Sequence, residues 1–364
     1  MDVDPGSGMK DVFAPDESTP IEVVGAGPAG LAAAITLARG GRRVVVHEAQ
    51  REVGHRFRRD LQGLENWSSA RDILDQMREA GLSTGFDAMP CTHGVGFDAW
   101  DRAYPLKSSR PLCYLVERGP RPGSLDRALL DQALALGVEV RFGSRKQGLS
   151  GPGILASGPR MADAIAVGYH FDSPMPDGFR VILDESLAPG GYAYLLTVGG
   201  RGTVKSCMFR DFGRQRLYVE RTVERFRRLV GLDMLSPRFH GGVGNFFVPA
   251  TGYHDGHPVV GEQAGFQDAF GGFGMRYAML SGVMAAESLM DGTDYDASWQ
   301  GEMKRPMQTA HVNRAIYNHL GNRGYRWLLR GQAWSGDTRA FFGWLYRSAR
   351  VRRLIVPWMQ GRRA

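Results

Sequence analysis

The sequence is poor in cysteine, and its cysteines form no motif. The 364 residues include only Cys91, Cys113 and Cys207, which lie far apart without a Cys-x-x-Cys pair. A structural zinc site and a vicinal dithiol redox centre are therefore not expected, and we predict no metal site. An odd number of free thiols favours a reducing, cytoplasmic setting.

Long apolar runs are also missing. No segment approaches the ~18 consecutive apolar residues that a membrane-spanning helix requires. The beginning, Met1 to Pro20, is acidic and rich in Pro, Gly and Ser, unlike a signal peptide, and we predict a disordered leader over residues 1–19. With 43% hydrophobic and 23% charged residues, the chain is otherwise typical of a globular protein, and its length suggests two domains or one large α/β body.

Acidic residues are scarce at the C-terminal end. Residues 301–364 contain thirteen Arg and Lys against two acids, Glu302 and Asp337, in a chain of formal charge +7. Trp and Phe recur among these cations at helical spacing. The segment is interpreted as a helical cap that packs its aromatic residues on the protein, or as a surface that lies in an anionic membrane headgroup layer. Nothing resembles a nucleic-acid-binding module, and we expect no nucleic acid partner.

The glycine-rich segment near the N-terminus carries the strongest signal. A β-branched strand at residues 21–24 leads into a Gly-x-Gly-x-x-Gly motif at residues 25–30. An Ala-rich helical stretch follows to about Arg39, and residues 43–48 form a second predicted strand that ends in an acid. A strand, this motif, a helix and a second strand in register predict a dinucleotide-binding βαβ unit.

Each part of the motif has a physical role. Gly25 makes the tight turn, Gly27 lets the backbone approach a pyrophosphate, and Gly30 lets the helix pack closely on the strand. The helix N-terminus supplies N–H donors for the phosphates, and Glu48 accepts hydrogen bonds from ribose hydroxyls. The predicted dinucleotide-binding residues are Gly25, Ala26, Gly27, Pro28, Ala29, Gly30, Glu48 and Ala49.

A second group of motifs lies in the C-terminal half. Residues 257–265 contain Gly-Glu-x-Ala-Gly, residues 270–275 form a Gly-rich loop, and residues 276–286 form a small-residue helix. Together with the first motif, this pattern resembles FAD-dependent oxidoreductases of the flavin hydroxylase superfamily. The likeness is greatest to the geranylgeranyl reductase family, which saturates isoprenoid double bonds.

The resemblance implies FAD as the cofactor and roles for particular residues. Glu262, where the family usually has Asp, would contact the ribityl chain. Residues 271–275 would lie along the isoalloxazine ring, where the following helix aims its N-terminus at the anionic reduced flavin. Arg118 would face the cofactor, and Ser157 with its neighbour Gly158 would pass beneath the adenosine. The additional FAD-binding candidates are Arg56, Arg118, Ser157, Gly158, Gly261, Glu262, Gly271, Gly272, Phe273, Gly274 and Met275.

Two segments bear on the substrate. Residues 189–196 are similar to the family's Pro-x-x-Tyr-x-Trp-x-Phe-Pro signature, with Tyr192 retained and Tyr194 in place of Trp, but without Phe-Pro. The family's Cys-Gly is replaced at residues 54–59 by a basic cluster, which would contact FAD phosphates or an anionic substrate head, or lie as a solvated loop. The predicted pocket residues are Phe57, Trp67, Tyr192 and Tyr194.

These patterns predict an α/β fold with a three-layer Rossmann-like FAD-binding domain, an antiparallel β-sheet substrate domain and a helical C-terminal region. The expected limits are 1–19 for the leader, 20–160 for the first part of the FAD domain, 161–250 for the β-rich substrate domain, 251–295 for the second part of the FAD domain and 296–364 for the basic helical region.

The leading functional hypothesis is reduction of a carbon–carbon double bond in a hydrophobic, isoprenoid-like or lipid substrate by hydride transfer from reduced flavin. Its reductant would be NAD(P)H, docking transiently, or a redox protein, and the sequence names no catalytic acid. A flavin monooxygenase and a non-catalytic FAD- or lipid-binding protein are the alternatives. We expect a cytoplasmic protein, with peripheral attachment to the inner face of the membrane as the variant that the basic region suggests.

Overall fold

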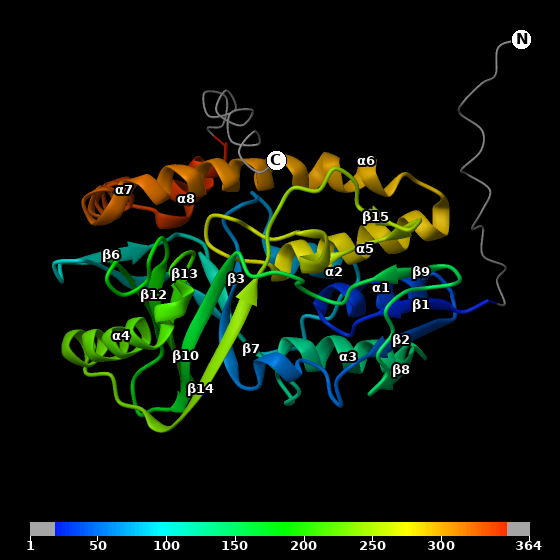
Figure 1. The fold of residues 1–364 in the computed structure, drawn as a ribbon, viewed down its shortest axis with the longest axis horizontal. Coiled ribbons are helices and arrows are strands. Elements are labelled where there is room, and N and C mark those ends of the chain that lie inside the picture. The colour runs from blue at the N-terminus through cyan, green and yellow to red at the C-terminus, as the bar shows by residue number, and fades with distance from the viewer. Residues whose placement is uncertain (1–18, 348–364) are drawn as a thin grey trace, which may run out of the picture.

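The structure, a computed structural model, describes residues 19–347. The predicted leader, apart from its last residue, and the end of the basic C-terminal region, residues 348–364, lie outside the described residues. Figure 1 shows a parallel sheet with its helices on one side of the molecule, a larger sheet on the other, and C-terminal helices above both.

The N-terminal motif folds as the predicted parallel βαβ unit. Strands β1 (Ile21–Val24) and β2 (Val44–Glu48) pair in parallel and are joined by helix α1 (Pro28–Arg39). Strands β8 (Glu139–Phe142) and β9 (Gly153–Leu155) extend the sheet to the order β8-β2-β1-β9. The central strands are almost entirely buried, as in parallel sheets that helices cover.

Small residues let helix α5 (Met275–Asp291) pack closely along α1, with α3 (Leu125–Ala135) beside it. A Cβ added to Gly282 would meet the carbonyl oxygen of Ala29, so this position requires glycine. The two helices run in the same direction, because Gly40, at the far end of α1, lies against Met290. Two segments that are 250 residues apart on the chain therefore bring their N-termini to the same end of the fold.

A three-stranded antiparallel sheet joins the two halves. Its order is β3 (Asp60–Glu65), β7 (Cys113–Arg118) and β4 (Ala88–Cys91), and helix α2 (Ile73–Glu79) follows β3. Strand β3 also contacts strands of the larger sheet, since Leu61 N donates to Thr203 Oγ1 at 3.0 Å.

The cysteines are less scattered in space than in sequence. Cys91 and Cys113 are directly paired across β4 and β7, and both are buried free thiols. A hydrogen bond from Cys91 and burial raise the pKa of the Cys113 thiol well above its usual value. Because the thiolate is the reactive form, this pair has the character of a packing contact rather than of a redox centre.

The predicted antiparallel sheet has seven strands, with one parallel pair, β5 and β11. Two of its strands come from residues 93–107, outside the expected range 161–250. In order across the sheet, the strands are β14 (Leu235–Gly244), β10 (Ala164–Asp172), β13 (Arg201–Met208), β12 (Tyr192–Val198), β11 (Gly178–Leu183), β5 (His93–Asp98) and β6 (Ala103–Lys107).

Alternation along the strands gives this sheet two different faces. Val204 and Leu195 point into a core that helix α4 (Gln215–Val230) covers. Their neighbours Lys205 and Tyr194 point to the opposite face, since successive side chains of a strand alternate. That opposite face is turned toward the parallel sheet and lines the cavity described below.

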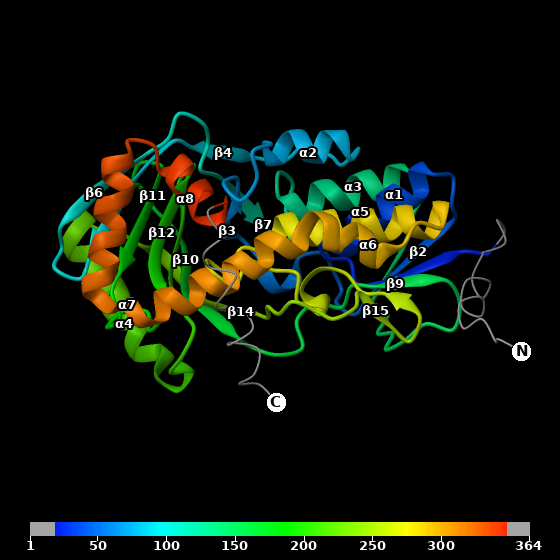
Figure 2. The ribbon, with the colours of Figure 1, turned by 90° about the horizontal axis from the view of Figure 1, so that it is seen from above.

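The C-terminal region is helical, as predicted, as far as it is described. Helix α6 (Tyr295–Trp299), a π-helical turn (Gln300–Lys304), α7 (Arg305–Ser335) and α8 (Thr338–Arg347) follow α5. Gly321 breaks the helical geometry of α7, and Figure 2 shows its second part beside β6, β11 and α8. Helix α7 also contacts β5. None of the helices within residues 19–347 has the length and apolar character to cross a bilayer.

Short elements complete the fold. They are the 3-10 turns His55–Phe57, Phe212–Arg214 and Gly261–Ala264 and the two-residue strands β15 (Tyr253–His254) and β16 (His257–Pro258).

Candidate functional site: one cavity between the two sheets

A single cavity of about 730 Å³ runs from the N-terminus of α1 to the inner face of the seven-stranded sheet. All but one of the residues predicted from sequence line it. These are Gly25, Ala26, Gly27, Pro28, Ala29, Glu48, Ala49, Arg56, Phe57, Trp67, Arg118, Ser157, Gly158, Tyr192, Tyr194, Gly261, Glu262, Gly271, Gly272, Phe273, Gly274 and Met275. The exception, Gly30, lies behind the wall.

The three motif glycines have different surroundings. Gly25 has φ of +111°, and a Cβ there would meet the carbonyl oxygen of Ala156. A Cβ on Gly30 would meet the carbonyl oxygen of Gly25, so both of these glycines hold the turn and the helix together. Gly27 has no atom within 4 Å of where its Cβ would be and lines the cavity. A pyrophosphate can therefore approach the backbone at Gly27.

Glu48 is fixed at the end of β2 by two backbone donors. Its Oε2 accepts from Ala26 N and its Oε1 from Gln50 N, both at 2.8 Å. A carboxylate has about four acceptor positions, so ribose hydroxyls can still bind to it. The opposite side of this end is formed by Ser157, whose N–H donates to Gln263 at 2.7 Å.

The N-terminus of α5 opens into the middle of the cavity. Its N-cap Gly274 has no side-chain cap, so its first N–H groups face the space with the partial positive charge of the helix end. Beside it, Gln267 donates to Gly272 O at 2.7 Å, while its buried Oε1 has no hydrogen-bond partner within the described part of the chain. Free donors and a free acceptor fit the polar edge of a flavin ring, and Gly27 fits its pyrophosphate, so these residues fit FAD.

Glu262 has an unusual pKa for a carboxyl group that lines the cavity. Burial raises its pKa to about 7, although Arg56 and Arg118 oppose this shift. Desolvation disfavours the charged carboxylate, and the two cations compensate only in part. The neutral acid form of Glu262 is therefore favoured more strongly than that of a solvated glutamate.

Arg118 is held more tightly than the resemblance implied. Its Nε and Nη2 donate to Asp126 at 2.8 and 2.9 Å, and its Nη1 donates to Gln62 at 3.2 Å. The guanidinium also lies 4.6 Å from the ring centroid of Phe57. Arg118 thus orients Phe57 and the start of α3. Its contribution to the cavity is a positive potential, since most of its donors are already in hydrogen bonds.

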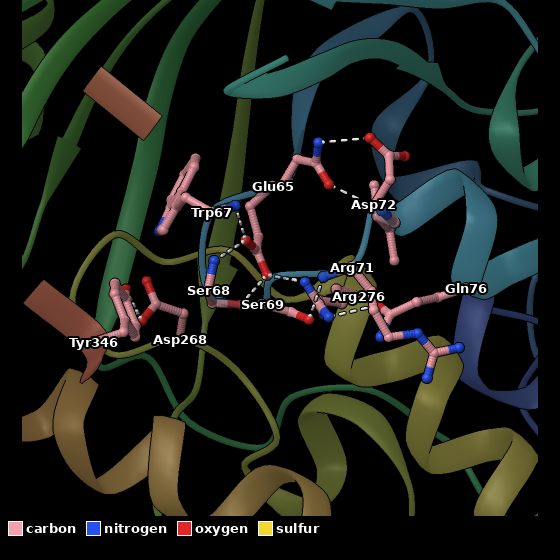
Figure 3. Close-up of polar contacts among 12 residues, drawn as sticks. Glu65, Trp67, Ser68, Ser69, Arg71, Asp72, Gln76, Asp268, Arg276 and Tyr346 are labelled. Atoms are coloured by element: carbon pink, nitrogen blue, oxygen red, sulfur yellow. Dashed lines mark hydrogen bonds and ion pairs between the residues drawn. The ribbon is translucent and has the colours of Figure 1, made fainter. Parts of the chain in front are cut away.

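A polar network behind the Gly-rich loop positions Trp67 (Figure 3). Glu65, fully buried, accepts from Trp67 N at 3.0 Å and from the Ser68 hydroxyl at 2.6 Å, and Arg276 Nη1 lies 3.6 Å from it. Trp67 packs edge-on against Phe273, with ring centroids 4.7 Å apart.

Asp268 anchors the loop itself. It accepts from Gly271 N at 2.7 Å and from the Tyr346 hydroxyl at 2.6 Å. The side chains of Asp268 and Tyr346 lie on the left of Figure 3. Burial raises the pKa of Asp268 to about 6, against these hydrogen bonds. Helix α8 is therefore tied to the cofactor side of the cavity.

The far end of the cavity is mostly apolar. Tyr192 and Tyr194 lie two positions apart on β12, with their rings tilted by 39° and the ring centroids 5.9 Å apart. The Tyr192 hydroxyl donates to Gly271 O at 2.5 Å. Leucines and phenylalanines of the C-terminal helices close the space over them. The apolar residues of this end are Phe179, Val181, Leu183, Leu196, Leu328, Leu329, Phe341 and Phe342.

Three contributors to this site were not predicted from the sequence. Helices α7 and α8 supply its roof, and the buried cations Arg314 and Lys205 lie in its wall. The sequence did contain a signal for Lys205, because it is a lysine at an inward-facing position of the predicted strand 203–209. No local pattern marks Arg314, because its partners lie on distant loops.

Arg314 joins these loops. It donates to the backbone carbonyls of Ala269, Gly190 and Phe270, and its guanidinium lies 3.6 Å from the ring centroid of Phe209. One side chain of α7 thereby connects the Gly-rich loop of the cofactor end to the turn that precedes β12.

The fold and this cavity define a dinucleotide-binding protein. Residues 23–64 match the model of the NAD(P)-binding Rossmann-like domain. A comparison with curated protein sequences finds no match.

Solved structures with the same fold are numerous. A geranylgeranyl bacteriochlorophyll reductase-like protein from Thermoplasma acidophilum is 17% identical, with a TM-score of 0.70 over 92% of this chain and 98% of that one. The flavin-dependent brominase Bmp2 is 15% identical, with a TM-score of 0.64 over 95% and 100%. The p-nitrophenol 4-monooxygenase of Pseudomonas putida is 16% identical, with a TM-score of 0.59 over 95% and 100%. The chain therefore has the fold of the FAD-dependent oxidoreductases that include geranylgeranyl reductase-like proteins and flavin hydroxylases.

Proposed function

We propose that this chain is an FAD-dependent oxidoreductase that reduces a carbon–carbon double bond of a hydrophobic, isoprenoid-like substrate. The observation that carries the proposal is the continuity of the cavity. It joins the glycine-lined cofactor end to the aromatic and aliphatic space over β12. Bound FAD would supply hydride chemistry at the junction.

The residues of this chain would bind and orient the two reactants. Gly27 and the N-terminus of α1 would hold the pyrophosphate, and the N-terminus of α5 would stabilise negative charge on the ring. Tyr192, fixed by Gly271 O, would set the distance between the sheet and the Gly-rich loop. The roof from α7 and α8 would exclude water from the apolar end.

The proposal is tested by anaerobic reduction of the purified flavoprotein with NAD(P)H or dithionite, followed by admission of oxygen and measurement of flavin absorbance. Slow reoxidation in one phase, together with saturation of an isoprenoid double bond under anaerobic conditions, is the expected result. Loss of substrate turnover when oxygen is excluded would contradict it.

A monooxygenase that hydroxylates a hydrophobic substrate is the second candidate. The p-nitrophenol monooxygenase, which covers this chain almost completely, favours it. Oxygen consumption equal to the hydroxylated product formed would establish this function instead. A protein that holds FAD but that no donor reduces would be a non-catalytic binding protein.

We further propose that α7 and α8 dock on an anionic membrane surface. Trp327 and Trp334 are 62% and 81% exposed, and Trp344 is also exposed. Residues 305–347 carry a single acid, Asp337, and seven arginines, of which all but the buried Arg314 are partly or fully exposed. The same helices close the cavity, so docking would place its apolar end beside the lipid.

The test is sedimentation with phosphatidylglycerol-containing vesicles. Deleting the helices would also open the cavity, so the substitutions Trp327→Ser and Trp334→Ser are preferable. Their combination should lower the vesicle affinity at least about tenfold, while Phe239→Ser, a change at an exposed residue of β14, should leave it unchanged. Equal binding of all three proteins would contradict the proposal.

A further inference from the structure

The large sheet contributes a buried cation to the cavity wall, and only part of its hydrogen-bonding capacity is used within the protein. Lys205 on β13 is 2% exposed and lines the cavity. Its Nζ donates to Asp60 Oδ2 at 2.6 Å and contacts His240 Nδ1 at 3.0 Å. An ammonium has three N–H donors, so one donor is left for a group inside the cavity.

The partners of Lys205 fix its position. Asp60 is fully buried and also accepts from Gln62 Nε2 at 2.8 Å and from Thr203 Oγ1 at 3.4 Å. Burial would raise the pKa of Asp60, but the charge and the hydrogen bond of Lys205, together with the hydrogen bond from Gln62, hold that pKa below its usual value. Asp60 is therefore an ionised, immobile acceptor on one side of the ammonium.

His240 is a neutral acceptor on the other side. Its Nε2 contacts Arg56 O at 2.6 Å, which assigns the ring proton to Nε2 and leaves Nδ1 to accept from Lys205. Burial first and the charge of Lys205 second lower the pKa of His240. Lys205, Asp60 and His240 thus form a preorganised group that holds the ammonium in place at the cavity wall.

Two other cations of the cavity wall, Arg118 and Arg314, already use their donors in hydrogen bonds within the protein. Arg118 is bound by Asp126 and Gln62, and Arg314 donates to three backbone carbonyls. A buried ion pair such as Asp60–Lys205 adds little stability by itself, since a well-packed apolar pair is often at least as stable. Its place at the edge of an apolar cavity points to ligand binding.

Resting on the proposed function, we propose that Lys205 binds an anionic oxygen of the substrate. The substrate would then be an amphiphile, with a carboxylate at Lys205 and an apolar body against Tyr194, Val181 and Leu329. The register of the sheet places Tyr194 directly beside Lys205, so the two ends of such a molecule can be held at once. A pure hydrocarbon would leave the third donor of Lys205 without an acceptor.

The experiment is calorimetric titration of the purified FAD-loaded protein with decanoate and with 1-decanol. The two probes have equal chain lengths and differ in the anionic oxygen. Wild-type protein should bind decanoate at least about tenfold more tightly, because hydrogen bonds between charged groups are the strong ones. Equal affinity for the two probes would overturn the proposal.

Variants test the charge directly. Lys205→Met alone would leave Asp60 buried without a partner and could unfold the protein, so it is combined with Asp60→Asn. The double variant should lose the preference for decanoate. Asp60→Asn alone should bind decanoate several-fold more tightly, because the charge of Lys205 is then uncompensated. A purely structural ion pair would give the opposite result for Asp60→Asn, weaker binding or none, and that outcome would overturn the proposal.

Lys304→Met is the matched control. Lys304 donates to Gln300 on the π-helical turn, away from the cavity, so decanoate binding should not change. Flavin content and flavin reduction are measured on the same samples. If the protein binds flavin that a donor can reduce, but binds decanoate and 1-decanol equally, only the role of Lys205 is contradicted. If the protein binds no flavin, the proposed function is contradicted.

Discussion

The two ends of the cavity are built in different ways. At the cofactor end the wall includes exposed backbone, with glycines at 25, 27, 261, 271, 272 and 274 and two helix N-termini. At the substrate end it is side chains, which come from the large sheet and from α7 and α8. The cofactor end therefore offers fixed backbone N–H groups to a ligand at close range. The substrate end offers a space whose shape is set by side chains.

This difference determines what each end can tolerate. Where backbone lines the cavity, glycine is required at the positions that a ligand or another segment of the protein approaches closely. One added methyl group at such a position blocks that approach. A side-chain wall depends on many contacts, none of which dominates. Substitutions at the cofactor end should therefore abolish binding, and substitutions at the substrate end should change stability or affinity by degrees.

The largest expected effect is that of Gly27→Val. The variant should lose FAD almost completely, because the new side chain occupies the space where the pyrophosphate approaches. The flavin-free protein should keep its melting temperature, since the Cβ position of Gly27 has no atom within 4 Å. Flavin absorbance after purification and thermal unfolding measure the two quantities.

Gly30→Val is the matched comparison within the same motif. Its side chain would overlap the carbonyl oxygen of Gly25, so this variant should fail to fold stably even without flavin. If Gly27→Val retained FAD, or if Gly30→Val folded normally, the division between a binding glycine and a packing glycine would be wrong.

The same difference explains what the sequence could predict. The βαβ unit, its parallel register and the presence of a β-rich sheet follow from local periodicity and from the glycine motif. The spacing of Gly25, Gly27 and Gly30 encodes the cofactor end because its contacts lie within a few residues. Arg314 and Lys205 meet partners more than 40 residues away, and no local pattern encodes that distance. The addition of β5 and β6 to the large sheet was hidden for the same reason.

Arg314 is the side chain on which the two ends depend together. Arg314→Met should lower the free energy of unfolding by about 3 kcal/mol, because three buried carbonyls lose a charged donor. Arg323→Met, on an exposed position of the same helix, should change it by less than about 0.5 kcal/mol. Urea unfolding of both variants measures this, and equal losses would show that the connection through Arg314 is not specific.

Glu262 should make the stability of the flavin-free protein depend on pH. Its pKa is raised to about 7 from 4.5, so the folded state favours the neutral acid. The stabilisation is present below pH 4.5 and is lost as the pH rises through 7, by about 2–3 kcal/mol. Asp268, with its pKa raised to about 6, acts in the same direction at lower pH.

Urea unfolding at pH 5 and pH 8 compares wild-type protein with Glu262→Gln. The variant should lose the fall in stability between pH 4.5 and 7 that Glu262 causes, and keep the part due to Asp268. An unchanged pH profile would show that Glu262 is solvated, and that the cofactor end is more open than its burial indicates.

The smallest expected effect concerns the contact between the two ends. Tyr192→Phe removes the hydrogen bond to Gly271 O and should cost about 1 kcal/mol of stability, the usual net value of one such bond. Tyr194→Phe is the control, because within residues 19–347 its hydroxyl makes no hydrogen bond. FAD affinity should weaken slightly in Tyr192→Phe alone, since Gly271 belongs to the loop that would face the ring. If flavin fluorescence titration gives the same affinity for both variants, the substrate sheet does not help to position that loop, and the two ends of the cavity act independently.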